Sequence, residues 1–231
     1  MKKSAQNQKT VKISLPSYIA GIPVAAPFRL SEEGRVKIRC ELCALPEEVV
    51  VIISCRLDSW KGHEFLFQAL AQVRKGNQWK LWVVGGGQAS GDANRRRLLE
   101  LLAGELGLTD CIRFLGHRDD VWKLLQAADI HCQPNSGPEP FGIAFVEALY
   151  AGIPVVSTSI GGALEIVTSD CGILVPPRDS VALATALTGL IENLELRRSL
   201  GSAGPSRARL LCDPDQQVAE IERVLLSCSR L

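Results

Sequence analysis

Two cations follow the first strongly apolar segment of the chain. Arg56 and Lys61 come just after the run Val49–Ser54, and Gly62 follows directly. Guanidinium and ammonium groups beyond a buried strand can bind phosphate oxygens, and a glycine lets backbone approach a ligand closely. A solvated loop whose cations pair with neighbouring carboxylates would have the same composition. This stretch alone slightly favours the solvated loop.

A second candidate segment runs from Asn135 to Gly152, where a polar loop enters an apolar helix. Glu139 lies in the loop, and Glu147 lies between one and two turns inside the helix. Gly142 falls in the first turn, where bare N–H groups and the positive end of the helix dipole attract anions, and its lack of a side chain would let a phosphate sit close. A carboxylate among apolar residues needs a hydrogen-bond partner, and two hydroxyls of a ribose or sugar would serve Glu147. A nearby arginine or a backbone turn would serve it as well.

Three further motifs give weaker signals. The run Gly85–Gly87 follows an apolar stretch and could hold a phosphate in backbone N–H groups, although such runs are commonly plain turns. Cys40 and Cys43 form a lone CxxC pair with no second pair at zinc spacing, which disfavours a metal or redox role. The Asp213–Asp215 motif is typical of a helix cap rather than a metal site.

The scaffold that positions these loops alternates strands with helices. Continuous β-branched runs are typical of strands buried on both faces, and the intervening stretches carry one apolar stripe at helical spacing. This alternation predicts a Rossmann-like, three-layer α/β/α domain with a mainly parallel sheet, whose ligands bind at the carboxyl ends of the strands. The predicted strands are Val49–Ser54, Lys80–Val84, Cys111–Leu115, Asp129–Gln133, Ile153–Ser157 and Gly172–Val175. The predicted helices are His63–Lys75, Arg95–Leu106, Asp119–Ala127, Phe141–Ala151, Ser180–Leu194 and Pro214–Ser227.

Composition is that of an ordinary globular protein. The chain has 231 residues, of which 46% are hydrophobic, and its net charge is +1. A net charge so close to zero gives no reason to expect binding to nucleic acid or to an anionic membrane. No transmembrane segment or signal peptide is predicted, because prolines interrupt the apolar stretch Leu15–Phe28. Several of the eight cysteines lie in apolar runs, which favours a reducing compartment and a cytoplasmic location. Residues 1–46 are expected to form a tail and linker with a short helix at Arg35–Leu42, and residues 47–231 the domain.

Several motifs in order resemble the retaining glycosyltransferases of family 4, which have the GT-B fold. Glu139 and Glu147, with seven residues between them, match that family's signature, and Phe-Gly follows the first Glu. Arg56-Leu57 and Lys61-Gly62 match its Arg-Leu…Lys-Gly loop. Further agreement comes from Leu115-Gly116, from Gly161-Gly162 with Glu165, and from Gly172–Pro176; the resemblance runs from about Gly21 to the C-terminus.

The resemblance implies that the chain is the C-terminal, nucleotide-sugar-binding domain of such an enzyme. Arg56 and Lys61 would bind the donor diphosphate and stabilise the charge that it gains on leaving. Gly142 and Ile143 would add backbone donors to the same phosphates. Glu139 would hold the transferred sugar, which makes Arg56, Lys61 and Glu139 the expected catalytic residues.

The remaining roles implied by the resemblance concern the nucleotide. Glu147 would hold the ribose, Phe141 would flank the donor site together with Trp60, and Arg118 would lie near the base. A sugar would move from a nucleotide diphosphate to an acceptor hydroxyl with retention of configuration. Lys and Arg would replace the divalent metal, so no metal or cofactor is expected.

A GT-B enzyme has a second Rossmann-like domain, which carries the acceptor site. About 46 residues precede the first predicted strand, too few for a domain of typical size. We therefore expect a partner chain that supplies the acceptor half, or a homodimer. A non-catalytic nucleotide-sugar-binding or interaction module, or a truncated remnant, is the alternative. A nicotinamide dehydrogenase is disfavoured, because no G-x-G-x-x-G opens the first helix after a strand.

Overall fold

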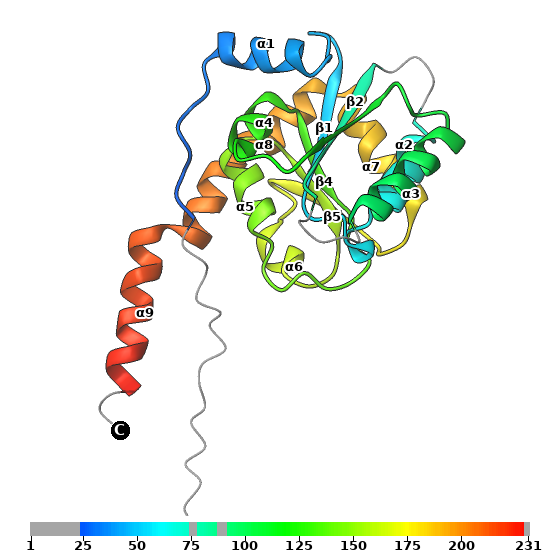
Figure 1. Cartoon of the computed structure of the whole chain (residues 1–231). Coiled ribbons are helices and arrows are strands. Elements are labelled where there is room, and N and C mark those ends of the chain that lie inside the picture. Colours follow the sequence, from blue (N-terminus) through cyan, green and yellow to red (C-terminus); the bar gives the residue numbers. More distant parts are fainter. Residues whose placement is uncertain (1–23, 74–77, 87–91, 229–231) are drawn as a thin grey trace, which may run out of the picture.

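The core of the protein is a six-stranded sheet in the order β3-β2-β1-β4-β5-β6, and all its pairings are parallel. The computed structural model describes residues 24–73, 78–86 and 92–228 (Figure 1). Every predicted strand is present with its ends shifted by two residues at most, which confirms the fold class. The strands are β1 (Val49–Ser54), β2 (Trp79–Val84), β3 (Ile112–Gly116), β4 (Ile130–Gln133), β5 (Val155–Thr158) and β6 (Gly172–Val175).

Helices cover both faces of the sheet (Figure 1). In β1, Val51 and Ile53 pack beneath α2, α3 and α7, whereas Val50 and Ile52 face α4, α5 and α8. This alternation explains why the strand sequence is continuously apolar. The helices are α1 (Glu32–Glu41), α2 (His63–Leu70), α3 (Asp92–Glu105), α4 (Val121–Ala127), α5 (Ile143–Tyr150), α6 (Ala163–Ile166), α7 (Ser180–Glu192), α8 (Leu194–Cys212) and α9 (Pro214–Cys228), with a 3₁₀ turn, η1, at Ser59–Lys61.

Several helices differ from the sequence prediction. Helices α1 and α3 each begin three residues earlier than predicted, and the short helix α6 was not predicted. The helix expected at His63–Lys75 ends at Leu70, and the last two residues of that range lie outside the described chain. The 19-residue helix α8 was not predicted, because it contains Pro205 and two glycines that are typical of helix ends.

Backbone contact joins α8 to the end of α5. A Cβ atom on Gly201 would lie 2.2 Å from the carbonyl oxygen of Gly152, and one on Gly204 would lie 2.7 Å from that of Leu149. Neither site has room for a side chain, so the two helices approach more closely than helices with side chains between them can. The position of α5 therefore depends on α8.

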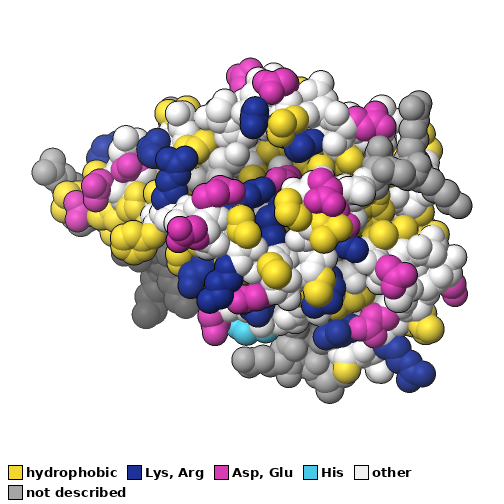
Figure 2. All heavy atoms as spheres, turned by 90° about the horizontal axis from the view of Figure 1, so that it is seen from above, with side chains coloured by type: hydrophobic (Ala, Val, Ile, Leu, Met, Phe, Trp, Pro, Cys, Tyr) yellow, Lys and Arg dark blue, Asp and Glu magenta, His cyan; other side chains and the backbone are white. Residues whose placement is uncertain are grey.

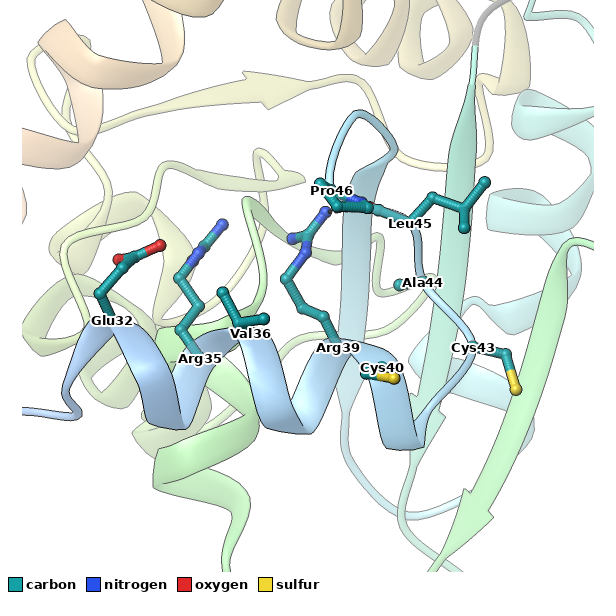
Figure 3. Close-up of a pocket in the computed structure, with 9 residues that line it drawn as sticks. All are labelled: Glu32, Arg35, Val36, Arg39, Cys40, Cys43, Ala44, Leu45 and Pro46. Carbon is teal, nitrogen blue, oxygen red and sulfur yellow. Dashed lines mark hydrogen bonds between the residues drawn. The ribbon is translucent and has the colours of Figure 1, made fainter.

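Residues expected to be a linker pack against the domain. Arg35 and Arg39 leave the same side of α1 (Figure 3), and their guanidinium groups lie 2.7 and 2.9 Å from the two carboxylate oxygens of Asp129. Asp129 also accepts a 2.7 Å hydrogen bond from the backbone N–H of Val50. Asp129 precedes β4, so α1 is anchored at the amino end of the strands, beside a cavity of about 430 Å³. The domain boundary at residue 46 stays a prediction.

The last helix, α9, extends away from the body of the domain (Figure 1). The Asp213 carboxylate accepts a 3.1 Å hydrogen bond from the N–H of Gln216, which confirms the predicted cap. The apolar side chains of Val218, Ile221 and Leu225 on α9 are exposed. On the face seen from above, acidic and basic side chains are intermixed (Figure 2). Among the described residues, no helix is both long and apolar enough to cross a membrane.

Candidate active site

A pocket of about 550 Å³ lies at the carboxyl ends of β1 and β4. It brings together the loop that follows β1, the loop that follows β4 and the start of α5. Six of the eight residues predicted to bind the donor line it; Arg118 and Glu147 do not. The lining residues are Ser54, Cys55, Arg56, Lys61, Gln133, Glu139, Pro140, Phe141, Gly142, Ile143 and Ala144.

Lys61 and Glu139 form the central ion pair of this pocket. The Nζ atom of Lys61 lies 2.5 Å from Oε2 of Glu139, and only 10% and 13% of the two side chains are exposed. The same Nζ lies 4.0 Å from the centroid of the Trp60 ring, a cation–π contact. Because little water surrounds the pair, the attraction between the two opposite charges is only weakly screened. The solvated-loop interpretation is therefore wrong for Lys61.

A close backbone approach positions Lys61. Gly62 has φ +81°, and a Cβ atom there would lie 1.8 Å from the carbonyl oxygen of Pro134. The backbone N–H of Ser136 donates to the carbonyl of Trp60 at 2.8 Å. Gly62 therefore admits the loop after β4 rather than a ligand, which corrects the sequence-based expectation and explains how Lys61 reaches Glu139.

The backbone around Glu139 rests on the Gly161–Gly162 pair after β5. A Cβ atom on Gly161 would lie 2.6 Å from the nitrogen and the oxygen of Glu139, and one on Gly162 would lie 2.1 Å from the oxygen of Phe141. The N–H of Gly162 donates to the carbonyl of Glu139 at 2.7 Å. The two glycines therefore hold the backbone that carries the Glu139 carboxylate, and a side chain at either glycine position would displace that backbone.

The start of α5 closes the opposite wall of the pocket. Gly142 caps this helix with φ +103°, and a Cβ atom there would lie 2.4 Å from the ring of Phe145. The glycine is thus required by backbone conformation and by Phe145, which corrects the expectation that it makes room for a phosphate. Within the described chain, the N–H groups of Gly142, Ile143 and Ala144 have no protein acceptor, and the three residues line the pocket.

The glycine run after β2 is a turn against the loop that follows β1. Gly85 has φ +123°, and a Cβ atom there would lie 1.9 Å from the carbonyl oxygen of Cys55. Gly85 and Gly86 line a separate hollow of about 210 Å³, and Gly87 lies outside the described residues. The plain turn is therefore the better interpretation for the described part of this run.

Two of the predicted cations are paired at the surface. Arg56 lies 2.9 Å from Asp58, and 71% of its side chain is exposed, so the solvated-loop interpretation does fit Arg56. Arg118 donates two hydrogen bonds of 2.8 Å to the carboxylate of Asp120, which raises the pKa of its guanidinium and lowers the pKa of Asp120. Its role near a base stays a prediction.

The side-chain carboxylate of Glu147 has no hydrogen-bond or ion-pair partner among the described residues. It lies on α5, one turn beyond Ile143, and it is half-buried. Burial raises the pKa of its carboxyl group above the ordinary value. The alternatives of an arginine partner or a backbone cap are thus not realised in the described chain, and the carboxylate is available to a ligand.

Four buried polar residues beside the site were missed by sequence reasoning. Burial lowers the pKa of His131 to about 3, and burial together with the charges of Arg95 and Lys61 does the same for His63, so both imidazoles are neutral. Gln133 and Asn135 are buried behind Glu139. For His131 and Gln133, the available signal was the presence of polar residues inside the strand sequence Ile-His-Cys-Gln, because buried polar groups in a central strand need partners or a function.

Comparison with known proteins decides the family. A family described as "Glycosyl transferases group 1" matches residues 38–207. The chain belongs to this family. It is 35% identical over 158 residues to the D-inositol 3-phosphate glycosyltransferase of Corynebacterium jeikeium, covering 66% of this chain and 38% of that protein. It is 43% identical over 106 residues to the phosphatidyl-myo-inositol mannosyltransferase of Mycobacterium leprae, covering 45% and 28%.

Solved glycosyltransferases have the same fold. The structure of Anabaena Alr3699/HepE in complex with UDP-glucose matches with a TM-score of 0.80 and 32% identity, covering 86% of this chain and 54% of that one. The C-terminal domain of a group 1 glycosyl transferase from Francisella tularensis, LpcC, matches in fold with a TM-score of 0.67, covering 80% of this chain and 93% of that one. The aligned part of this chain spans 28% and 38% of the length of the two curated relatives, well under two thirds of either. The prediction that the chain is a domain of the glycosyltransferase family is confirmed at the level of group 1.

Proposed function

We propose that this group 1 domain is the donor-binding, C-terminal half of a retaining, metal-independent family 4 glycosyltransferase. It would move a sugar from a nucleotide diphosphate sugar to an acceptor hydroxyl. The observation that carries the proposal is the Lys61–Glu139 pair, which faces the free N–H groups at the start of α5 across one pocket. A cation, a carboxylate and backbone donors together suit a sugar attached to a diphosphate.

In this proposal the donor separates the Lys61–Glu139 pair. The ammonium of Lys61 turns to the diphosphate, joined by exposed Arg56 and the N–H groups of Gly142 and Ile143. Glu139 then accepts hydrogen bonds from hydroxyls of the sugar. The negative charge that develops on the leaving diphosphate is stabilised by these fixed donors, so no divalent metal is needed.

The nucleotide extends from the diphosphate along α5. Glu147, whose carboxylate has no partner among the described residues, accepts hydrogen bonds from the ribose hydroxyls. Half-buried Phe141 borders the donor, and Arg118 lies toward the base. The acceptor-binding half belongs to the rest of a longer protein, to a separate partner chain or to a second copy. A cytoplasmic location is part of the proposal, supported by the buried free thiols of Cys132, Cys171 and Cys212.

Calorimetry with a panel of nucleoside diphosphates and their sugars, in the presence of a chelator, tests the proposal. Wild type should bind one nucleotide class, and Lys61→Ala should weaken that binding tenfold or more, roughly the loss of a charge-assisted hydrogen bond. Lys80→Ala is the matched control, because Lys80 is another little-exposed lysine paired with a glutamate, Glu48, but lies outside the pocket.

Each other outcome has a defined meaning. Binding that requires a divalent metal would contradict the metal-independent mechanism. Equal losses in Lys61→Ala and Lys80→Ala would contradict the site. Donor binding with no transfer in the presence of an acceptor-binding partner would favour the alternative, a non-catalytic nucleotide-sugar-binding module.

A further inference from the structure

Two buried amides lie directly behind Glu139. The side-chain nitrogen of Gln133 donates to Oε2 of Glu139 at 3.3 Å and to Oδ1 of Asn135 at 3.0 Å. Both amide residues are only 1% exposed. Since both of these acceptors are oxygens, only the nitrogen of the Gln133 amide can serve them, which fixes the orientation of the amide.

Strand β5 holds the backbone of both amides. The Ser157 hydroxyl donates to the carbonyl of Gln133 at 2.8 Å, and the Thr158 hydroxyl donates to the carbonyl of Asn135 at 2.7 Å. Gln133 is also the last residue of β4, a central strand. Its amide therefore stands on a rigid part of the sheet, whereas Glu139 stands on a loop.

The two amides are not fully satisfied by the protein. The Oε1 atom of Gln133 and the Nδ2 atom of Asn135 are buried and have no hydrogen-bond partner in the part of the chain that the structure describes. Burying unpaired polar atoms is unfavourable, and an apolar side chain at the end of β4 would avoid it. A residue kept only for the fold would have both ends of its amide paired, so this arrangement points to a functional role.

The Gln133 contact also leaves one carboxylate oxygen unused. Lys61 and Gln133 both contact Oε2 of Glu139, whereas Oε1 has no partner among the described residues. If Lys61 turns to a diphosphate, the Gln133 N–H is the remaining contact that orients the carboxylate. Without it, a loop carboxylate would be free to rotate away from the sugar.

We infer that Gln133 is the positioning residue for Glu139, holding Oε2 so that Oε1 accepts a hydrogen bond from a hydroxyl of the transferred sugar. This inference rests on the proposed function and adds a determinant of sugar binding to it. It predicts that Gln133 contributes to the binding of the sugar and not to the binding of the nucleotide. The measurable quantity is the ratio of the Kd for the nucleoside diphosphate to the Kd for the same diphosphate carrying the sugar.

The test compares wild type with Gln133→Met, an unbranched side chain of similar length without an amide, using the nucleotide and sugar that wild type binds. The Kd for the diphosphate should stay within about twofold, while the ratio should fall roughly tenfold, the effect expected for losing a hydrogen bond to a charged group. Gln72→Met is the control, because Gln72 is exposed in the turn that follows α2, does not line the pocket and should change neither value.

Every other result counts against the inference. An unchanged ratio would show that Gln133 does not act on the sugar, and an equal loss of both affinities would make it a general part of the scaffold. Failure of both Gln133→Met and Gln133→Leu to fold would make it a requirement of the fold. If wild type bound the diphosphate and its sugar equally, only this inference would fail; if it bound no nucleotide, the proposed function itself would fail.

Discussion

The two cations that follow β1 differ in how firmly the protein holds them. Lys61 is enclosed by Glu139 and the Trp60 ring, whereas the guanidinium of Arg56 stands in solvent beside Asp58. An enclosed ammonium gives a fixed charge, and an exposed guanidinium can follow a phosphate as it moves. We therefore expect the two residues to contribute differently to stability and to binding.

Arg56→Ala should separate binding from stability. Its surface ion pair contributes little, so the free energy of unfolding should change by less than about 0.5 kcal/mol. Affinity for the nucleoside diphosphate should fall roughly tenfold at low salt and by less at high salt, because salt screens an exposed charge. Urea denaturation and calorimetry at two salt concentrations measure these effects; an affinity equal to wild type at low salt would remove Arg56 from the donor site.

Glu147 should make nucleotide binding sensitive to acid. Its carboxyl must be ionised to accept two hydroxyl hydrogen bonds, and burial raises its pKa. Affinity should therefore weaken as pH falls toward that raised pKa, at a pH where an ordinary carboxyl would still be ionised. Titration of the nucleotide phosphate acts in the same direction, so Glu147→Gln is the reference: its affinity should be lower at neutral pH and should change less with pH.

The same carboxyl should affect stability with the opposite sign. A carboxyl with a raised folded-state pKa binds its proton more tightly when folded, so its contribution opposes folding as pH rises through the unfolded and then the folded pKa. Thermal unfolding without ligand at neutral pH should therefore give Glu147→Gln a Tm equal to or above that of wild type. A clearly lower Tm would show that the carboxylate has a structural partner.

The individual site residues were only partly predictable. Motif spacing selected Arg56, Lys61, Glu139 and Glu147, but spacing along a chain does not show which side chains meet. The Lys61–Glu139 contact depends on the approach of the two loops at Gly62 and Pro134. Gln133 belongs to no motif, and only its burial beside Glu139 in three dimensions gives it a role.

Among the loops and helices, the Gly161–Gly162 turn has the clearest structural requirement. Gly162 has an ordinary helical backbone, so Gly162→Ala adds only a methyl group, which would meet the Phe141 carbonyl. That clash should displace the loop of Glu139, lower the unfolding free energy by about 1–3 kcal/mol and weaken binding of the nucleotide sugar. Denaturation and calorimetry on the same preparation measure both effects.

Gly189→Ala is the matched control for that substitution. Gly189 lies inside α7, and a Cβ atom there would meet nothing within 4 Å. Alanine should therefore stabilise the protein by about 0.5–1 kcal/mol through helix propensity, with donor binding unchanged. If both substitutions destabilised the protein similarly, the clash with the Phe141 carbonyl would not be the cause of the effect of Gly162→Ala.

The strands were predicted well because their burial on both faces leaves a continuous β-branched pattern such as Val49–Ser54. Helix α8 was missed because its local sequence, with Gly201, Gly204 and Pro205, is typical of a helix end. Its glycines serve contact with α5, and tertiary packing overrides their low helix propensity. Contacts of this kind have no signature in a local window of sequence.

In the molecule as a whole, α1 and the donor pocket occupy opposite ends of the sheet. Asp129→Asn would leave buried Arg39 without its carboxylate partner, which should lower the unfolding free energy by about 3 kcal/mol. Nucleotide affinity of the folded variant should stay within twofold, because the change is remote from the pocket. Glu195→Gln removes an exposed partner of Arg198 and should alter neither quantity. A loss of affinity in Asp129→Asn would show that the two ends are coupled.

Association with another chain remains a prediction for the whole molecule. The exposed apolar side chains of Ile221 and Leu225 on α9 offer one surface for it. Sedimentation over a wide concentration range should show a shift to a larger species, reduced in an Ile221→Ser, Leu225→Ser double variant. A single monomeric species at all concentrations would contradict self-association.

The contact between α8 and α5 has a consequence for how loss-of-function variants would be interpreted. Because carbonyls of α5 and of the turn after it meet Gly201 and Gly204 directly, a single methyl group on either glycine would tilt α5, the helix that Gly142 caps and that carries Glu147. A random mutagenesis screen for lost sugar transfer should thus recover these two positions alongside the pocket residues. In the results of such a screen the two glycines would look like ligand contacts, although they act only by setting the orientation of α5.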